Sequence, residues 1–296
     1  MKIAAISTLA LAVGLTSSFT NALPSSVQRR QSDSQGYISP LSNGGSMLTG
    51  NTASGLGEPL NVIVSGLSSA GVLNQAGFEE FSRSIYFSPG SCLNISQGGY
   101  QTANLGDGDG AQPQTNIMRY NYKQGDGGTC LESLKGGNHF RYWIQNGTAA
   151  DSGAVFIAAS VELNATLNHM IAPNGYDNGR DQLVGNATAG TLKSPGGFEY
   201  TVTKQTNSQL LSGISASQIN HGIGIDGIVD VLTVTITKNG TIGAGRDSSG
   251  SSSNGGSVST PQQSAALSAF GSAHSGLVLA LSVLAVCIAS GLLIVV

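Results

Sequence analysis

The chain has 296 residues, a formal net charge of −3 and only 10% charged residues, well below the ~25% of an ordinary soluble domain. Glycine, with 42 residues, together with Ser, Asn and Thr, takes the place of the missing charges. Because no basic stripe is present, the sequence lacks the electrostatic footprint of a nucleic-acid binder, and we expect no nucleic-acid partner.

The N-terminus has the features of a secretory signal peptide. A single Lys2 precedes an apolar run that ends at Leu15, and small polar residues lead to Ala22. This run is shorter than the ~20 apolar residues of a membrane span, so we expect residues 1–22 to be removed as a signal peptide.

Residues 23–57 are rich in Ser, Gly and Asn and show little apolar periodicity. This composition predicts a disordered lead-in. Arg29 and Arg30 form a dibasic pair within it that resembles a processing site of secretory precursors, and cleavage there stays open.

The folded part is expected at residues 58–242. Residues 60–65 (LNVIVS) form a β-branched run that predicts a buried strand. Apolar residues at near-helical spacing between 68 and 85, interrupted by Gly77, predict a helix that packs on this strand.

Residues 98–128 are rich in Gly, Asp, Asn and Gln and are expected to be mostly loop, apart from a short segment at 116–122. The stretch LGDGDGAQ at 105–112 resembles an oxygen-ligand calcium loop, but it lacks the bidentate Glu at the twelfth position. We therefore favour a turn over a calcium site.

Three cysteines, at positions 92, 130 and 287, bear on the compartment. Cys287 lies in an apolar tail that is expected to be removed, which leaves an even pair in an oxidising lumen. We expect a disulfide between Cys92 and Cys130, with an entropic stabilisation of about 3 to 4 kcal/mol. The 37 intervening residues match no metal-ligand spacing.

The centre of the chain carries most of the candidate chemistry. Residues 139–144 alternate as a strand does, and the apolar run 154–161 is its expected neighbour across a turn at 146–147. Further elements are expected as strands at 200–203 and 228–237 and as a helix at 179–186 or 216–220. The sum predicts an α+β fold, a single domain with a mixed β-sheet and a few packed helices, flanked by disordered segments.

Several blocks of this region resemble a known family. They are PLNVIVSG at 59–66, NHFRYW at 138–143, AVFIAAS at 154–160, and NHMIAP at 168–173 followed by Asp177 and Gly179-Arg180-Asp181. In this order they resemble the LssY-like C-terminal domain family, as found in uncharacterised secreted fungal proteins. The resemblance implies a fold and supplies no established reaction, and the membrane-embedded part that accompanies the domain in bacterial members is not found in this sequence.

The histidines of these blocks are candidates for catalysis or metal binding. The candidate catalytic residues are His139, His169 and Asp181. The candidate metal ligands are His139, His169 and His221 with Asp177, Asp181 or Asp226. Neutral imidazole is a common metal ligand, but the spacing matches no metal motif such as HExxH. The alternative is that each His bonds a backbone carbonyl. The sequence has no GxSxG, no P-loop and no His-paired catalytic Cys, and we expect no cofactor.

Candidate ligand-binding residues are Arg141, Trp143, Arg180 and His221. The aromatic cluster of Phe140, Tyr142 and Trp143 has the chemistry to stack on a sugar, and core packing is the alternative. The two arginines have a structural alternative as well, in ion pairs with Asp177, Asp181 or Glu162.

N-x-[ST] sequons occur at Asn94, Asn146, Asn164, Asn186 and Asn239. In a chain routed to the secretory pathway, this density predicts N-glycosylation at several of them, on surface loops.

The C-terminal end resembles a glycosylphosphatidylinositol (GPI) signal. A Ser/Gly-rich stalk and spacer at 243–275 precede an uncharged apolar tail at 276–296, which would be exchanged for a lipid. Ser264 is the expected attachment residue, with Gly271 and Asn254 as alternatives. Flanking Lys or Arg residues that would orient a membrane span are missing, but a single-pass anchor at 276–296 is the alternative.

These features predict a secreted, GPI-anchored cell-surface or cell-wall glycoprotein with a ligand-binding face. Its expected location is the outer face of the plasma membrane or the cell wall, with the membrane and a cell-wall polysaccharide as candidate partners. An extracellular metal- or His/Asp-dependent hydrolase is the first alternative, and a single-pass membrane protein is the second. Convergence of His139, His169 and one carboxylate would favour the hydrolase.

Overall fold

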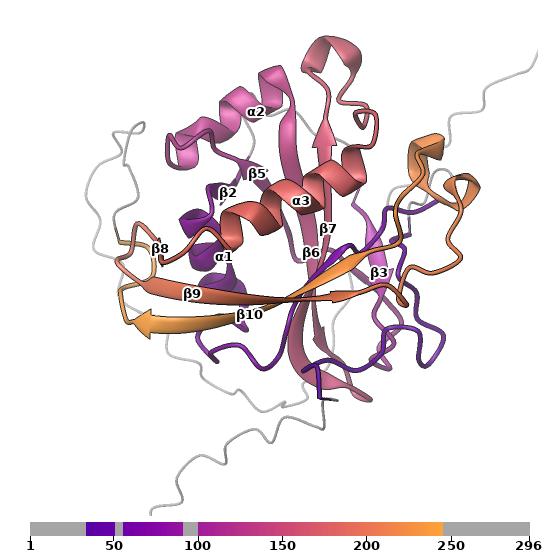
Figure 1. Cartoon of the computed structure of the whole chain (residues 1–296), viewed down its shortest axis with the longest axis horizontal. Helices are drawn as coiled ribbons and strands as arrows, with labels where there is room; N and C mark the ends of the chain where they lie inside the picture. Colours follow the sequence, from indigo (N-terminus) through magenta and orange to yellow (C-terminus); the bar gives the residue numbers. More distant parts are fainter. Residues whose placement is uncertain (1–33, 51–55, 91–99, 245–296) are drawn as a thin grey trace, which may run out of the picture. The chain divides into compact units, whose positions relative to one another are not determined.

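The computed structural model describes residues 34–50, 56–90 and 100–244 (Figure 1). In this part of the chain an eight-stranded sheet has the order β2-β5-β6-β7-β1-β10-β9-β8. Its strands are β1 (Val62–Val64), β2 (Phe87–Pro89), β5 (Asn116–Tyr120), β6 (Gly137–Asn146), β7 (Asp151–Glu162), β8 (Leu192–Lys193), β9 (Glu199–Asn207) and β10 (Val229–Lys238). The pair β1 and β10 is parallel and the other pairs are antiparallel, so the sheet is mixed.

The remaining elements are short. A second sheet pairs β3 (Thr102–Asn104) with β4 (Ala111–Pro113). The helices are α1 (Gln75–Ser84), α2 (Thr129–Lys135) and α3 (Gly175–Ala187), and 3-10 turns are η1 (Asp126–Gly128), η2 (Ala165–Leu167), η3 (Ala216–Gln218) and η4 (Asn220–Gly222). The predicted α+β class, a single domain with a mixed sheet and a few helices, is confirmed.

The strands β6 and β7 form the long central hairpin, as their alternation predicts. Side chains of successive strand residues point to opposite faces, and the register pairs His139 with Ser160 and Trp143 with Phe156. One face of β6 therefore carries His139, Arg141 and Trp143, and the other carries the residues between them. The two faces enter different cores.

Helices α1 and α3 cover the face of β6 that carries Phe140 and Tyr142, which we call the first face. The face that carries His139, Arg141 and Trp143 is the second face. Phe78 of α1 and Leu183 of α3 pack with Phe140 and the other sheet residues of that face into one apolar core. Helix α3 approaches β7 very closely at Gly179, where an added Cβ would lie 2.5 Å from the Cα of Ser160. A glycine is required here because any larger residue would hold the helix away from the sheet.

The second face is covered by residues 34–50, which corrects the expectation of a disordered lead-in for that stretch. Tyr37 and Met47 are buried there in a core of their own with residues of β1, β6 and β7. The Gln145 side-chain amide also bonds both the N–H and the carbonyl of Ile38. The Ser- and Gly-rich composition concealed these buried contacts.

Other expectations need correction in their boundaries. The predicted loop at 98–128 contains the β3–β4 hairpin in addition to β5. The predicted helix at 68–85 begins only at Gln75, because the Asn74 side chain caps it by accepting from the Gly77 N–H. The helix expected at 179–186 is the longer α3, and the stretch 216–220 contains the 3-10 turn η3 and the first residue of η4.

Several sequence-based expectations lie outside the described residues. They are the signal peptide, the pair Arg29 and Arg30, Cys92, Asn94, the attachment residues Asn254, Ser264 and Gly271, and the tail at 276–296. Within the described residues, no helix combines the length and apolar character that crossing a membrane requires.

Candidate functional site: a buried polar cluster

The second face of the sheet changes from apolar to charged toward one end of β6 and β7. Arg119 of β5 is the register partner of His139, which in turn pairs with Ser160 of β7. Arg141 and Glu162 lie two residues along their strands and therefore share this face. Together with Glu132 of α2 and His169, the residues Arg119, His139, Arg141 and Glu162 form what we call the polar cluster.

Glu162 is the centre of the cluster. Its Oε1 lies 3.4 Å from His139 Nε2, and its Oε2 lies 3.5 Å from His169 Nδ1. The His139 side chain is 1% exposed, whereas Glu162 and His169 are 10% and 14% exposed. The cluster thus reaches the surface through Glu162 and His169.

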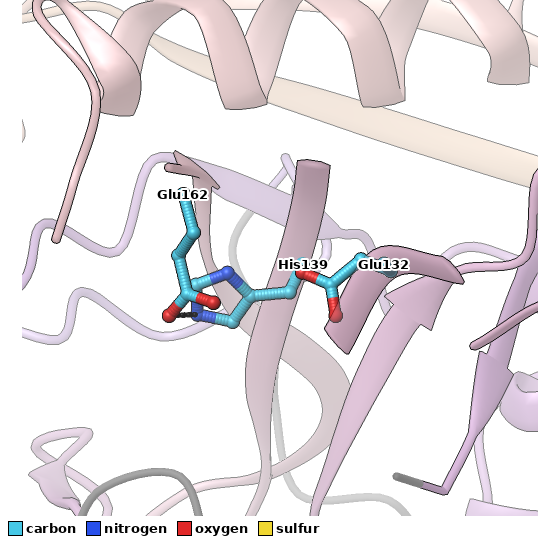
Figure 2. A group of neighbouring side chains, drawn as sticks. All are labelled: Glu132, His139 and Glu162. Carbon is cyan, nitrogen blue, oxygen red and sulfur yellow. Dashed lines mark ion pairs between the residues drawn. The ribbon is translucent and has the colours of Figure 1, made fainter. Parts of the chain in front are cut away.

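Glu132 approaches from the other side of the His139 ring in the view of Figure 2. Its Oε2 accepts from Arg119 Nη1 at 2.7 Å, and both side chains are buried. The same Arg119 nitrogen lies 3.7 Å from Glu162 Oε2. One guanidinium therefore faces both carboxyl groups.

His169 reaches the cluster because the chain after β7 doubles back. The Leu163 N–H donates to the Met170 carbonyl, and Glu162 forms an isolated bridge with Ile171. His169 and the residue before it both have left-handed backbone, with φ of 50° and 54°. Such backbone is uncommon outside glycine and clusters at functional sites.

A ring of hydrogen bonds supports Arg141 behind the cluster. Arg141 Nη1 donates to Gln114 Oε1, which also accepts from the Gln101 backbone N–H. The Gln101 side-chain amide donates to Glu58 Oε1 and accepts from the Thr49 hydroxyl. All of these residues are buried, so the arrangement of donors and acceptors is fixed by packing.

Burial changes the protonation of the central groups. Desolvation, followed by the nearby charge of Glu132, raises the pKa of Glu162 to about 8. Desolvation, followed by the Arg119 charge, lowers the pKa of His169 and holds the pKa of His139 well below its usual value. These shifts favour the protonated form of the Glu162 carboxyl group and the neutral form of both imidazoles.

Many polar atoms here lack a hydrogen bond within the protein. Among the described residues, buried atoms without a hydrogen bond include Glu58 Oε2, Glu132 Oε1, His139 Nδ1, Arg141 Nε, Ser160 Oγ and Glu162 Oε2. Leaving such a group unpaired costs about 1–3 kcal/mol. Several of these atoms belong to the polar cluster, which makes the cluster a candidate binding site.

Of the candidate catalytic residues, the structure brings together His139 and His169 but not Asp181. Asp181 is exposed and pairs with Arg180. Arg180 also binds Asp226 through two hydrogen bonds, and the Asp226 N–H donates to Asp177. The predicted convergence of histidines with these aspartates is therefore wrong, because the aspartates surround Arg180 at α3.

The other candidate residues have different surroundings. Trp143 is 2% exposed and its Nε1 donates to the Gln112 carbonyl, so it is a core residue and not a sugar platform. His221 is exposed in η4 and is not part of the cluster. Arg180 is structural. Arg141 is the one ligand-binding candidate that belongs to the cluster.

Sequence analysis missed Arg119 and Glu132 and considered Glu162 only as a partner for an arginine. A usable signal was present for Glu162. Glu162 directly follows the apolar run 154–161. By strand alternation its side chain lies on the same face as those of residues 158 and 160, and charges are rare in this chain. For Arg119 and Glu132 no local pattern marks the site, because the sheet register and helix α2 bring them there.

The aspartate-rich stretch at 105–112 is the turn of the β3–β4 hairpin. Asp109 Oδ1 accepts from the Thr148 N–H and hydroxyl, and the Asp107 carbonyl accepts from Ala149 and Ala150. These bonds attach the turn to the loop between β6 and β7, in agreement with the preference for a turn.

Comparisons with protein-family models, with curated proteins and with solved structures gave no match, so the LssY-like resemblance stays a prediction.

Proposed function

We propose that this protein is a secreted cell-surface glycoprotein, held by a GPI lipid at the outer face of the plasma membrane or in the wall. Its domain binds a polar ligand at the polar cluster. The observation that carries the binding role is the group of buried, unpartnered nitrogen and oxygen atoms around Glu162.

The chemistry of these atoms favours a hydroxyl-rich ligand. Arg141 Nε is a donor, whereas Glu58 Oε2 and Glu132 Oε1 are carboxyl oxygens without a donor. A sugar hydroxyl donates one hydrogen bond and accepts others, so it satisfies such a mixed set. The sugar unit of a cell-wall polysaccharide has this chemistry.

The positions of the sequons support the surface role. Asn146 and Asn239 are exposed, and Asn164 and Asn186 are partly exposed. Glycans at the exposed Asn146 and Asn239 would extend into solvent without displacing core side chains.

The location is tested on intact cells. We expect phosphatidylinositol-specific phospholipase C to release the protein and a peptide N-glycosidase to reduce its apparent mass. Replacement of Ser264, Gly271 or Asn254 by Leu, one at a time, identifies the attachment residue. Retention on the cells after phospholipase treatment, with the tail at 276–296 still present by mass spectrometry, would support the single-pass alternative instead.

The binding role is tested with defined sugars. The full chain, purified in the form that cells produce, is titrated with glucan and chitin oligosaccharides by calorimetry. Saturable binding should be lost in Glu162→Ala and kept in Asp181→Ala, which removes an exposed carboxylate outside the cluster. Equal binding by both variants would show that the ligand does not bind at the polar cluster.

An extracellular hydrolase is the second candidate. The observation that favours it is the meeting of His139 and His169 at one carboxyl group, because imidazole and carboxyl groups within a few ångströms can exchange protons with a substrate. Assays on nitrophenyl esters, phosphates and glycosides test it. Turnover that persists unchanged in Glu162→Gln would exclude this site as its source.

A further inference from the structure

The inner part of the polar cluster has the donor set of a transition-metal site. Glu132, His139 and Glu162 each offer one ligand atom, and these atoms all lie within 4.8 Å of one another (Figure 2). We propose that these residues bind one divalent first-row transition-metal ion, with His169 as a further ligand. This adds an ion to the binding site proposed above and rests on that binding role.

The distances around Glu162 fit such an ion better than a direct hydrogen bond. The separations of 3.4 Å to His139 Nε2 and 3.5 Å to His169 Nδ1 exceed the usual N–H···O range of about 2.7–3.2 Å. Two ligands bound tetrahedrally to zinc at 2.0–2.1 Å lie roughly 3.3–3.4 Å apart. The separation of Glu162 from each imidazole therefore matches that of neighbouring ligands, and the ligand atom of Glu132 lies within 4.8 Å of those of His139 and Glu162.

Of the two carboxyl oxygens of Glu132, one accepts a hydrogen bond and the other does not. Arg119 holds its Oε2 at 2.7 Å, while Oε1 has no hydrogen-bond partner although the side chain is 0% exposed. A metal-bound carboxylate is commonly oriented by a hydrogen bond to its second oxygen. Arg119 is placed to do this for Glu132.

The type of ion follows from the donors. Two imidazoles with carboxylates are typical of zinc and other first-row metals, whereas calcium and magnesium prefer oxygen ligands alone.

The elements that supply the donors also suit a preformed site. His139 and Glu162 stand on paired central strands, Glu132 stands on a helix, and only His169 comes from a turn.

The charges of the cluster are compatible with a cation. Arg119 and Arg141 are opposed by Glu58, Glu132 and Glu162, all buried or nearly so.

The test uses the full chain in the form that cells produce, freed of metal with a chelator and dialysed. Zinc is added and measured by calorimetry and elemental analysis. We expect one zinc per chain. His139→Gln and Glu162→Gln should each weaken binding by more than the roughly 10–100-fold cost of losing an outer-shell partner. His221→Gln and Asp181→Asn, which change an exposed His and an exposed Asp outside the cluster, should bind as the unmodified protein does.

Cobalt gives a second readout that does not depend on the variants being well folded. In the unmodified protein, Co²⁺ at a four-coordinate site with nitrogen ligands should produce strong visible absorption that zinc abolishes. Absence of zinc and cobalt uptake would overturn the inference, and so would equal binding by the cluster variants and their controls. Oligosaccharide binding by the metal-free protein without zinc uptake would overturn the metal site and leave the binding role intact. Zinc uptake without oligosaccharide binding would overturn the oligosaccharide-binding role and leave the metal site intact.

Discussion

Arg119 and Glu132 form an ion pair at 2.7 Å with both side chains almost completely buried, at 3% and 0% exposure. Removing one partner of such a pair leaves a buried charge without compensation. We expect Arg119→Met to lower the free energy of unfolding by about 3–5 kcal/mol, measured by urea denaturation. Adding Glu132→Gln to this variant should recover part of the loss. Lys193→Met, which breaks an exposed pair with Glu199, should change stability by less than about 1 kcal/mol.

The proton on Glu162 makes the stability of the metal-free protein depend on pH. Its pKa is about 8 in the folded state and about 4.3 in an unfolded chain. Between these values the folded state holds a proton that the unfolded state has lost. The contribution of Glu162 to stability is therefore full below the unfolded pKa and is lost as pH rises through the folded one, by up to about 1.4 kcal/mol per pH unit. The lowered pKa values of His139 and His169 act in the opposite direction at acidic pH.

Urea denaturation in the presence of a chelator, repeated from pH 4.5 to 9, measures this dependence. Glu162→Gln cannot release a proton, so its stability should lack the Glu162 contribution and vary less with pH. Asp181→Asn should keep the slope of the unmodified protein. A slope that is the same in Glu162→Gln would show that another group binds the proton.

Two glycines of helix α3 are expected to respond to alanine in opposite directions. A Cβ on Gly179 would lie 2.5–2.7 Å from the backbone of Ser160, whereas a Cβ on Gly185 would meet nothing within 4 Å. Gly179→Ala should therefore destabilise by about 1–3 kcal/mol, as overpacking does. Gly185→Ala should stabilise by about 0.4–1 kcal/mol through reduced freedom of the unfolded chain. Thermal unfolding measures both changes in stability. If the two substitutions changed stability in the same direction, the close packing of α3 on β7 would be contradicted.

The predicted disulfide is tested by its two cysteines. Cys92→Ser, Cys130→Ser and the double variant should each lose the same stability, about 3 to 4 kcal/mol. The unmodified denatured protein should show no thiol reactive to a disulfide reagent. Cys287→Ser is the matched control and should leave the mature protein unchanged if the tail is removed. A thiol titratable at position 92 or 130 without reductant would argue against the bridge.

The sequence predicted the elements whose pattern is local. The alternation of 139–144 and the run 154–161 gave the central hairpin, because one side of each strand enters a core. The segment 34–50 was missed because two buried anchors, Tyr37 and Met47, are too few to produce a periodicity. Strands as short as β2 and β8 carry no periodic pattern and form through their neighbours.

Only part of the site was predicted, because distant segments of the chain bring its residues together. The two histidines were identified, but the acids assigned to them were Asp177, Asp181 or Asp226, which lie further along the chain. Helix α3 packs on the opposite face of the sheet from His139, since its Leu183 shares a core with Phe140. The acid that does meet both imidazoles is Glu162 on the neighbouring strand, and the strand register brings it beside His139.

The central position of β1 has a consequence for how the chain comes off the ribosome. Ile63 pairs with Phe156 on one side and Val231 on the other, so an early segment must wait for two partners that are made much later. Long-range pairing of this kind slows folding and leaves apolar edges open meanwhile. We therefore expect the domain to fold only after β10 has been made, and truncation before β10 should leave nascent chains that depend on chaperones.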